Sequence, residues 1–323
     1  IEGQAYGWWT AINDFQLGPI NLNTGGMSVV PFAFLIGVVL LGLLVAWELP
    51  RTRNGKGTLI DIPLFGIRRY GFGNVVALVV SLGEFGILFV LPLWLQSVAG
   101  LDPLTTGALI AFLAVGTLLA GGAARGVSAR LGATQVVRLG MILEIIGIIG
   151  IGWGFSTTRS PWWLVIPLMI YGAGLGFASA QLTNVVLADV PLEKSGQASA
   201  MTSTFRQVGS ALGAAILGAV LFTGLGDDLG KKLDDLPGVS TPQAEQIVNS
   251  VQGSAGQAIV AMEKNPAFAP IVEDAKAAYT DSAKLTALVA AIFVFFGLMA
   301  SLGLPKDSVA DDTSAAEDLP VAG

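Results

Sequence analysis

Three ionisable residues interrupt long apolar segments of the sequence, and they are the first candidates for chemistry. Glu84 lies near the middle of one segment, Glu144 lies about two turns into a second, and Arg206 lies a little over two turns into a third. If those segments span a membrane, each charge costs at least about 2.5–3.5 kcal/mol, and such residues usually face a bundle interior or a cavity. The three positions are therefore candidates for binding protons or ions inside a bilayer.

Glu84 is the candidate for proton coupling. The sequence has no histidine, so proton exchange near neutral pH would depend on carboxyl groups, and burial favours the neutral form of a carboxyl. The alternative is a neutral carboxyl that hydrogen-bonds across helices. Arg206 cannot deprotonate, so we expect it to hold a carboxylate or an anionic group of a substrate. Its alternative role is a structural ion pair with Glu144 or Asp189, and Glu144 could equally lie near Arg138.

Neutral side chains near these charges complete a candidate substrate cavity. Phe85 follows Glu84 directly. Gln181 and Asn184 lie in a fourth apolar segment, and Gln207 lies beside the arginine. We expect these five residues to line the cavity, with ordinary hydrogen bonding between helices as the alternative for the amides.

Glycines spaced by four residues favour close contact between helices. Gly209 and Gly213 have this spacing, so we expect them to pack against a neighbouring helix. The apolar segments contain no paired aspartates, no serine–histidine arrangement and no set of metal ligands. We therefore expect no catalytic residue, no metal site, no cofactor and no enzymatic activity. A basic stripe is also absent, so we expect no nucleic-acid partner.

The overall composition places these segments in a membrane. Hydrophobic residues make up 53% of the 323 residues and charged residues 12%, whereas a soluble domain carries about 25% charged residues. A hydrocarbon core about 30 Å thick needs roughly 20 apolar residues of helix, and backbone groups in lipid must be hydrogen-bonded internally. Seven segments meet this length, near 29–48, 73–97, 104–124, 136–155, 163–187, 198–223 and 283–304. We therefore predict an all-α membrane protein with seven transmembrane helices.

The distribution of Lys and Arg predicts the orientation. Basic residues gather in loops 49–72 and 125–135, while the short loops on the opposite side contribute only Arg159. Because positively charged loops stay in the cytoplasm, the N-terminal end of the chain is predicted to lie outside and the C-terminal end inside. Within the outer loop, Thr241-Pro242 predicts the start of a short surface helix. The predicted parts are an outer loop at 1–28, a transmembrane helix at 29–48, a basic cytoplasmic loop at 49–72, a six-helix domain at 73–304 with an outer loop at 225–282, and a disordered acidic cytoplasmic tail at 305–323.

Two similar motifs indicate an internal repeat. PLTTG at 103–107 opens the third apolar segment, and PLEKSG at 191–196 opens the sixth. In the predicted orientation the first lies outside and the second lies inside, three helices later. Two three-helix units of inverted topology have this pattern, which is typical of secondary transporters.

Several stretches in a consistent order resemble the drug:proton antiporter-2 family of the major facilitator superfamily, the fourteen-helix multidrug exporters. They are LPLWLQ at 91–96, PLTTG at 103–107, RLGA at 130–133, SGQA at 195–198 and RQVGSALG at 206–213. The resemblance implies that helix 29–48 is the second of two extra central helices, and that the other six form the C-terminal six-helix domain. It also implies that Glu84, Gln181 and Asn184 lie on cavity-lining helices. Glu144 would lie on a peripheral one.

These observations together predict the C-terminal half of a proton-coupled transporter in the plasma membrane, exporting drugs or lipophilic metabolites by alternating access. The expected partners are protons, the lipid bilayer, a small-molecule substrate and an N-terminal helical domain. A lipophilic cation would suit a buried carboxylate as the substrate. We expect that domain to precede this sequence in the natural protein. The alternative is a transport-inactive membrane scaffold or truncated remnant. A retinal-type receptor would need a lysine midway along the last segment, but Lys284 stands at its start.

Overall fold

The chain folds into long helices that could cross a membrane. The computed structural model describes residues 15–17, 20–22, 29–53, 60–237 and 239–304. Seven helices in these ranges are long and apolar enough to span a bilayer, so the predicted all-α membrane fold with seven spans is confirmed. A short antiparallel hairpin of β1 (Phe15–Leu17) and β2 (Ile20–Leu22) also forms, which the apolar pattern does not predict.

Six of the seven spanning helices are longer than the apolar segments that predict them, and the helix predicted at 163–187 begins two residues later than its segment. Their bounds are α2 (Val29–Arg53), α3 (Arg68–Ser97), α4 (Pro103–Leu131), α5 (Ala133–Gly154), α6 (Val165–Leu187), α7 (Ser195–Asp234) and α10 (Ala269–Ser301). The shorter helices are α8 (Thr241–Gly253), α9 (Gln257–Met262) and the 3-10 helices η1 (Ile62–Gly66), η2 (Pro161–Leu164), η3 (Leu192–Lys194) and η4 (Pro266–Phe268). The apolar pattern reports contact with lipid, so it misses helical turns that continue into water.

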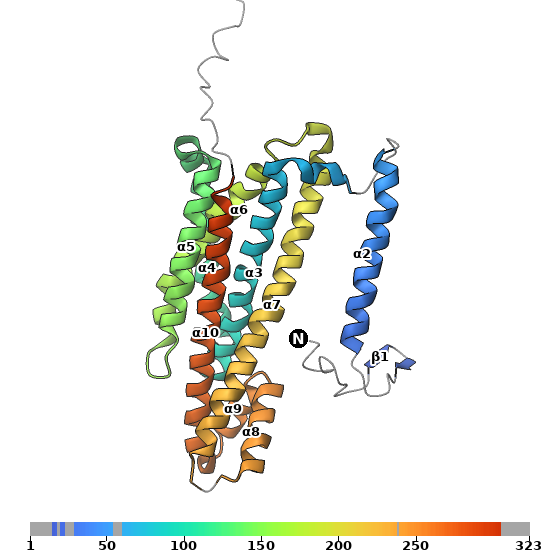
Figure 1. Cartoon of the computed structure of the whole chain (residues 1–323). Coiled ribbons are helices and arrows are strands. Elements are labelled where there is room, and N and C mark those ends of the chain that lie inside the picture. Colours follow the sequence, from blue (N-terminus) through green and yellow to red (C-terminus); the bar gives the residue numbers. More distant parts are fainter. Residues whose placement is uncertain (1–14, 18–19, 23–28, 54–59, 238, 305–323) are drawn as a thin grey trace, which may run out of the picture.

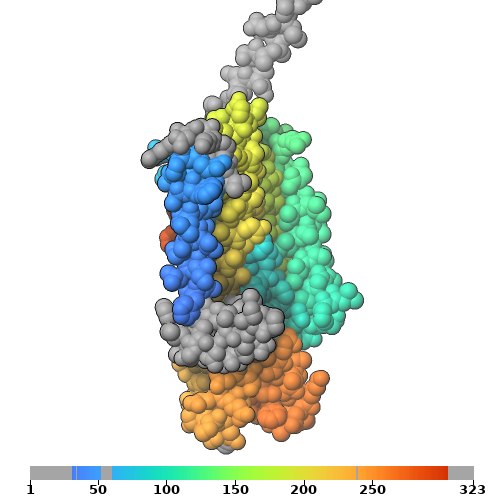
Figure 2. Space-filling view, turned by 90° about the vertical axis from the view of Figure 1, so that its right-hand side faces the viewer, coloured from blue at the N-terminus to red at the C-terminus, as the bar shows by residue number. Residues whose placement is uncertain are grey.

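Six of the spanning helices form one bundle, and α2 stands beside it (Figure 1). Helices α4, α5 and α6 pack together, as do α3, α7 and α10, and contacts of α5 with α10 and of α3 with α6 join the two groups. In the space-filling view α2 (blue) forms a separate column along the bundle (Figure 2). Its side chains, including Leu40 and Leu41, are largely exposed, so α2 contributes little to the core of the bundle.

The packing of the bundle repeats with inverted direction. Helix α4 packs on α6 as α7 packs on α3, and α5 packs on α6 as α10 packs on α3. The order α3, α4, α5 is thus matched by the order α6, α7, α10. Because three spans separate matching helices, the two units run in opposite directions through the membrane. This arrangement agrees with the repeated motifs at 103–107 and 191–196.

Arginine and tryptophan pairs mark the two ends of the membrane region. At one end the guanidinium of Arg51 lies 5.8 Å from the ring centroid of Trp47. At the other end Arg159 lies 5.8 Å from the ring centroid of Trp153. Both residue types are typical of the interface between acyl chains and water. The end marked by Arg51 also holds the C-terminal end of α10 and the turn between α6 and α7 (top of Figure 1).

Helices α7 and α10 continue well beyond the end marked by Arg159. Helix α7 has 40 residues and is therefore about 60 Å long, twice the thickness of the hydrocarbon core. Its far end and the start of α10 form a subdomain with α8 and α9, comprising the described residues of 225–282 (bottom of Figure 1). It is called the outer subdomain below, after the outer loop predicted for these residues. The predicted outer loop is therefore largely helical. The helix predicted to start at Thr241-Pro242 does form, but its N-cap is Ser240, which makes a capping box with Gln243.

Asp102 caps the N-terminus of α4. Its Oδ1 accepts hydrogen bonds from the backbone N–H groups of Leu104 at 2.9 Å and Thr105 at 3.1 Å, and its Oδ2 accepts one from the Thr105 hydroxyl at 2.5 Å. These hydrogen bonds, led by the one from the Thr105 hydroxyl, hold the pKa of Asp102 below its ordinary value. The cap therefore depends on the ionised carboxylate.

We expect Asp102→Ala to lower the melting temperature of the detergent-solubilised protein at neutral pH. Because the pKa of Asp102 is lower in the folded than in the unfolded state, its contribution is present above the unfolded-state pKa and is lost as pH falls through the folded-state pKa. The gap in melting temperature between the two proteins should therefore close at acidic pH. A gap that stays constant down to pH 3 would contradict this role.

Candidate functional site

Glu84 points into the helix bundle. The residue is 3% exposed, and its Oε2 atom lies 3.9 Å from Nη2 of Arg206 on α7. Tyr171 on α6 donates a hydrogen bond from its hydroxyl to the backbone carbonyl oxygen of Glu84, at 3.0 Å. The carboxyl group on α3 is therefore held among helices and does not face acyl chains.

Arg206 connects three helices around this carboxyl group. Its Nε atom donates to Oγ of Ser81 on α3 and its Nη2 atom donates to Oγ of Ser179 on α6, both at 3.4 Å. Its side chain is 31% exposed, so the residue lies partly at the surface of the described bundle. Asp189, considered above as its partner, instead pairs with Arg69 at 3.6 Å. The acid that Arg206 pairs with is thus Glu84.

Glu144 lies in the same region but has no direct partner. It is 0% exposed, and within the described part of the chain neither carboxyl oxygen has a hydrogen-bond partner. The charges of Glu84 and Arg206 both act on it. Arg138, the other cation considered for it, donates to the backbone carbonyl of Ser301 at 2.8 Å. Glu84, Glu144, Tyr171 and Arg206 are called the ionisable cluster below.

The neutral candidates lie partly on an open polar face. Gln181 is 7% exposed and accepts a hydrogen bond from Nδ2 of Asn184 at 3.5 Å. Asn184 and Gln207 are exposed, and Phe85 is 46% exposed. An amide on a membrane-spanning helix is unfavourable where it faces acyl chains. The face that carries Asn184 and Gln207 is therefore suited to water or to another part of a protein.

The outward faces of α5 and α10 differ from the side of the bundle that carries Asn184 and Gln207. The outward faces of α5 and α10 carry Ile146, Ile149, Leu288 and Ile292, all of which are exposed. Such apolar faces match acyl chains. The exposed side of α6 and α7 thus carries amides beside apolar residues such as Val208 and Leu212, whereas the outward faces of α5 and α10 are apolar at these positions.

Gly209 and Gly213 lie where α7 meets α3. A Cβ atom on Gly209 would overlap the backbone carbonyl of Leu78, and one on Gly213 would overlap that of Leu82. The absence of side chains therefore lets the two backbones approach directly. This contact sets the distance between Arg206 on α7 and the Glu84 carboxyl on α3.

Three residues of this site were not among the sequence candidates. They are Tyr171, Ser81 and Ser179, which supply hydroxyl groups to Glu84 or Arg206. Ser81 lies three residues before Glu84, so the two side chains share one face of the helix, and this spacing could have identified Ser81 from the sequence. Tyrosine and serine are common in bundled helices, so the other two positions carry no comparable signal.

Residues 17–214 match the family model of the Major Facilitator Superfamily. The chain is 34% identical over 208 residues to the "Probable actinorhodin transporter" of Streptomyces coelicolor, covering 62% of this chain and 35% of that protein. It is 27% identical over 264 residues to "Multidrug efflux pump LfrA" of Mycolicibacterium smegmatis, covering 81% and 50%. It is 30% identical over 241 residues to "Methyl viologen resistance protein SmvA" of Salmonella typhimurium, covering 72% and 47%. The chain thus spans half or less of the length of these curated relatives.

Proposed function

This chain belongs to the Major Facilitator Superfamily, and we propose that it is the C-terminal half of a transporter that exports drugs or lipophilic metabolites in exchange for protons. The observation that supports this most directly is the ion pair between Glu84 and Arg206, since it places a buried carboxyl group beside a fixed positive charge in the membrane region. The names of the relatives, which include a multidrug efflux pump, agree with this direction of transport.

The exchange depends on competition between a proton and a cation for the Glu84 carboxyl group. The group can be protonated and neutral, or it can be ionised and hold a cation, and binding of the proton opposes binding of the cation. A cationic substrate that binds near Glu84 would therefore release a proton, and protonation of Glu84 from the outer side would release the substrate. Arg206 competes for the same carboxylate, so it returns the empty site to a neutral state.

A second helical domain completes the cavity in this proposal. Asn184 and Gln207 are exposed on helices long and apolar enough to span a membrane, and a partner domain across a water-filled cavity would satisfy these amides. The six-helix bundle and that domain would open the cavity to each side in turn. In this proposal the protein lies in the plasma membrane, with the basic loops and the end of α10 on the cytoplasmic side.

The test uses the complete transporter, reconstituted in proteoliposomes, with methyl viologen as the substrate. If the lumen is one pH unit more acidic than the medium, the gradient supports about tenfold accumulation for each exchanged proton. We expect an uncoupler that abolishes the pH gradient to reverse this accumulation. Uptake that is equal with and without the gradient would reject proton exchange, and the absence of all uptake would favour the scaffold alternative.

A further inference from the structure

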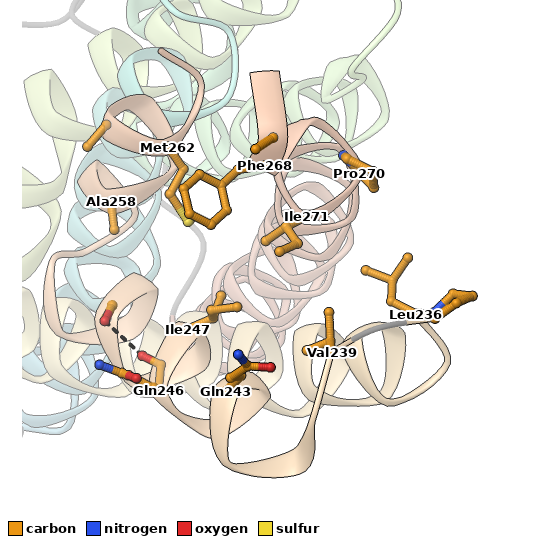
Figure 3. A pocket seen from close by; sticks show the side chains of 14 residues that line it. Leu236, Val239, Gln243, Gln246, Ile247, Ala258, Met262, Phe268, Pro270 and Ile271 are labelled. Carbon is orange, nitrogen blue, oxygen red and sulfur yellow. Dashed lines mark hydrogen bonds between the residues drawn. The ribbon is translucent and has the colours of Figure 1, made fainter. Parts of the chain in front are cut away.

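We propose that the outer subdomain holds a binding site for an uncharged lipophilic small molecule, separate from the ionisable cluster. The cavity has a volume of about 800 Å³ (Figure 3). It is lined by Leu236, Pro237 and Val239, which follow α7, and by residues of α8, α9, η4 and the start of α10. Sites for small molecules typically have volumes of about 300–1,000 Å³ and mostly apolar walls. The cavity is therefore of a size for one such molecule.

The walls of the cavity are adapted to an apolar ligand. Four apolar side chains project toward one another across it, from Ile247 of α8, Met262 of α9, Phe268 of η4 and Ile271 of α10 (Figure 3). A methionine thioether is flexible and polarisable, so it adjusts to ligands of different shape. The phenyl ring supplies a broad flat surface. These side chains favour an aromatic or alicyclic compound.

The polar groups of the cavity are few and neutral. Among the described residues, none of the 14 that line it carries a charge. Gln243, Gln246 and Ser250 lie along one side on α8, and the Ser250 hydroxyl donates to the backbone carbonyl of Gln246 at 2.7 Å (Figure 3). The two amide side chains can orient a ligand by hydrogen bonds. A charged ligand would find no counter-ion here, so the site selects uncharged molecules.

The cavity lies beyond the membrane-spanning part of α7 and α10. Its lining begins at Leu236 and ends at Ile271, beyond the exposed acids Asp227 on α7 and Asp281 on α10, so it lies outside the hydrocarbon region. A lipophilic molecule in water gains about 25 cal/mol for each Å² of apolar surface that it buries. The cavity would thus hold such a molecule in the aqueous zone next to the membrane.

The test uses the complete transporter, with any cysteine outside this chain replaced by serine. This chain has no cysteine, so a single introduced cysteine is then the only thiol. Ala261→Cys and Ser250→Cys place a thiol on the cavity wall, and Gln257→Cys places one at an exposed position on α9 outside the lining. Each variant is treated with a membrane-impermeant maleimide, with and without Nile red, an uncharged lipophilic dye. Methyl viologen, a dication, is the charged control ligand.

We expect Nile red to slow labelling of both cavity cysteines. At ten times its Kd, an occupying ligand slows the reaction about elevenfold, while the rate at Gln257→Cys should change less than twofold. The proposal is overturned by unchanged labelling in the cavity, by equal slowing at all three positions, by equal protection from methyl viologen, or by cavity cysteines that fail to react without dye. Labelling requires no transport, so the result is independent of the proposed proton exchange.

Discussion

Glu84→Gln in the complete transporter is expected to remove gradient-driven accumulation of substrate. Glutamine keeps the size and the hydrogen-bonding capacity of the side chain but cannot gain or lose a proton. The roughly tenfold accumulation that one pH unit supports for each exchanged proton should therefore fall to a ratio of about one. The measurement is methyl viologen uptake into proteoliposomes with an imposed pH gradient.

A second measurement separates loss of coupling from loss of structure. Exchange of labelled for unlabelled substrate at equal pH needs no net proton movement, so it should persist in Glu84→Gln even if it is slower. Glu245→Gln is the matched control, because Glu245 is exposed on α8 outside the membrane region. Full gradient-driven accumulation by Glu84→Gln would remove Glu84 from the coupling step. Loss of accumulation in Glu245→Gln as well would point to a general effect of charge.

Segment length and apolarity predict the membrane helices because contact with acyl chains requires both. The same signal ends at the bilayer surface. The predicted end of α7 is therefore near residue 223, although the helix continues to Asp234. Beyond the bilayer the helix is amphipathic, and Leu229 and Leu233 are fully buried in the outer subdomain. A stripe of leucines spaced by four residues is a weaker signal than an unbroken apolar run, which explains the missed turns.

The sequence identifies the charges of the site better than it identifies their partners. Glu84 and Arg206 stand out because a charge within an apolar run has a high energetic cost. Which acid lies beside Arg206 depends on the rotation and depth of α3, α5 and α7, and the sequence does not encode these quantities locally. The structure brings Arg206 to Glu84 and leaves Glu144 buried without a hydrogen bond. Asp189 lies with Arg69.

The double variant Gly209→Ala/Gly213→Ala is expected to destabilise the folded chain. Each added methyl group would overlap a backbone carbonyl of α3, at Leu78 or Leu82, and a backbone carbonyl cannot move aside as a flexible side chain can. Overpacking of this kind costs about 1–3 kcal/mol at each site. Alanine gains about 1 kcal/mol over glycine in helix propensity, so the steric cost should exceed the gain. Thermal unfolding in detergent should show a lower melting temperature.

Gly122→Ala on α4 tests whether the steric explanation is correct. No atom lies within 4 Å of a Cβ placed there, so only the gain in helix propensity applies. The melting temperature of Gly122→Ala should therefore equal or exceed that of the unsubstituted protein. The double variant should also weaken proton coupling, because moving α7 away from α3 separates Arg206 from Glu84, two residues beyond Leu82. Equal melting temperatures for both variants would show that α3 and α7 do not depend on this close approach. The Glu84–Arg206 distance would then have to be set by other contacts.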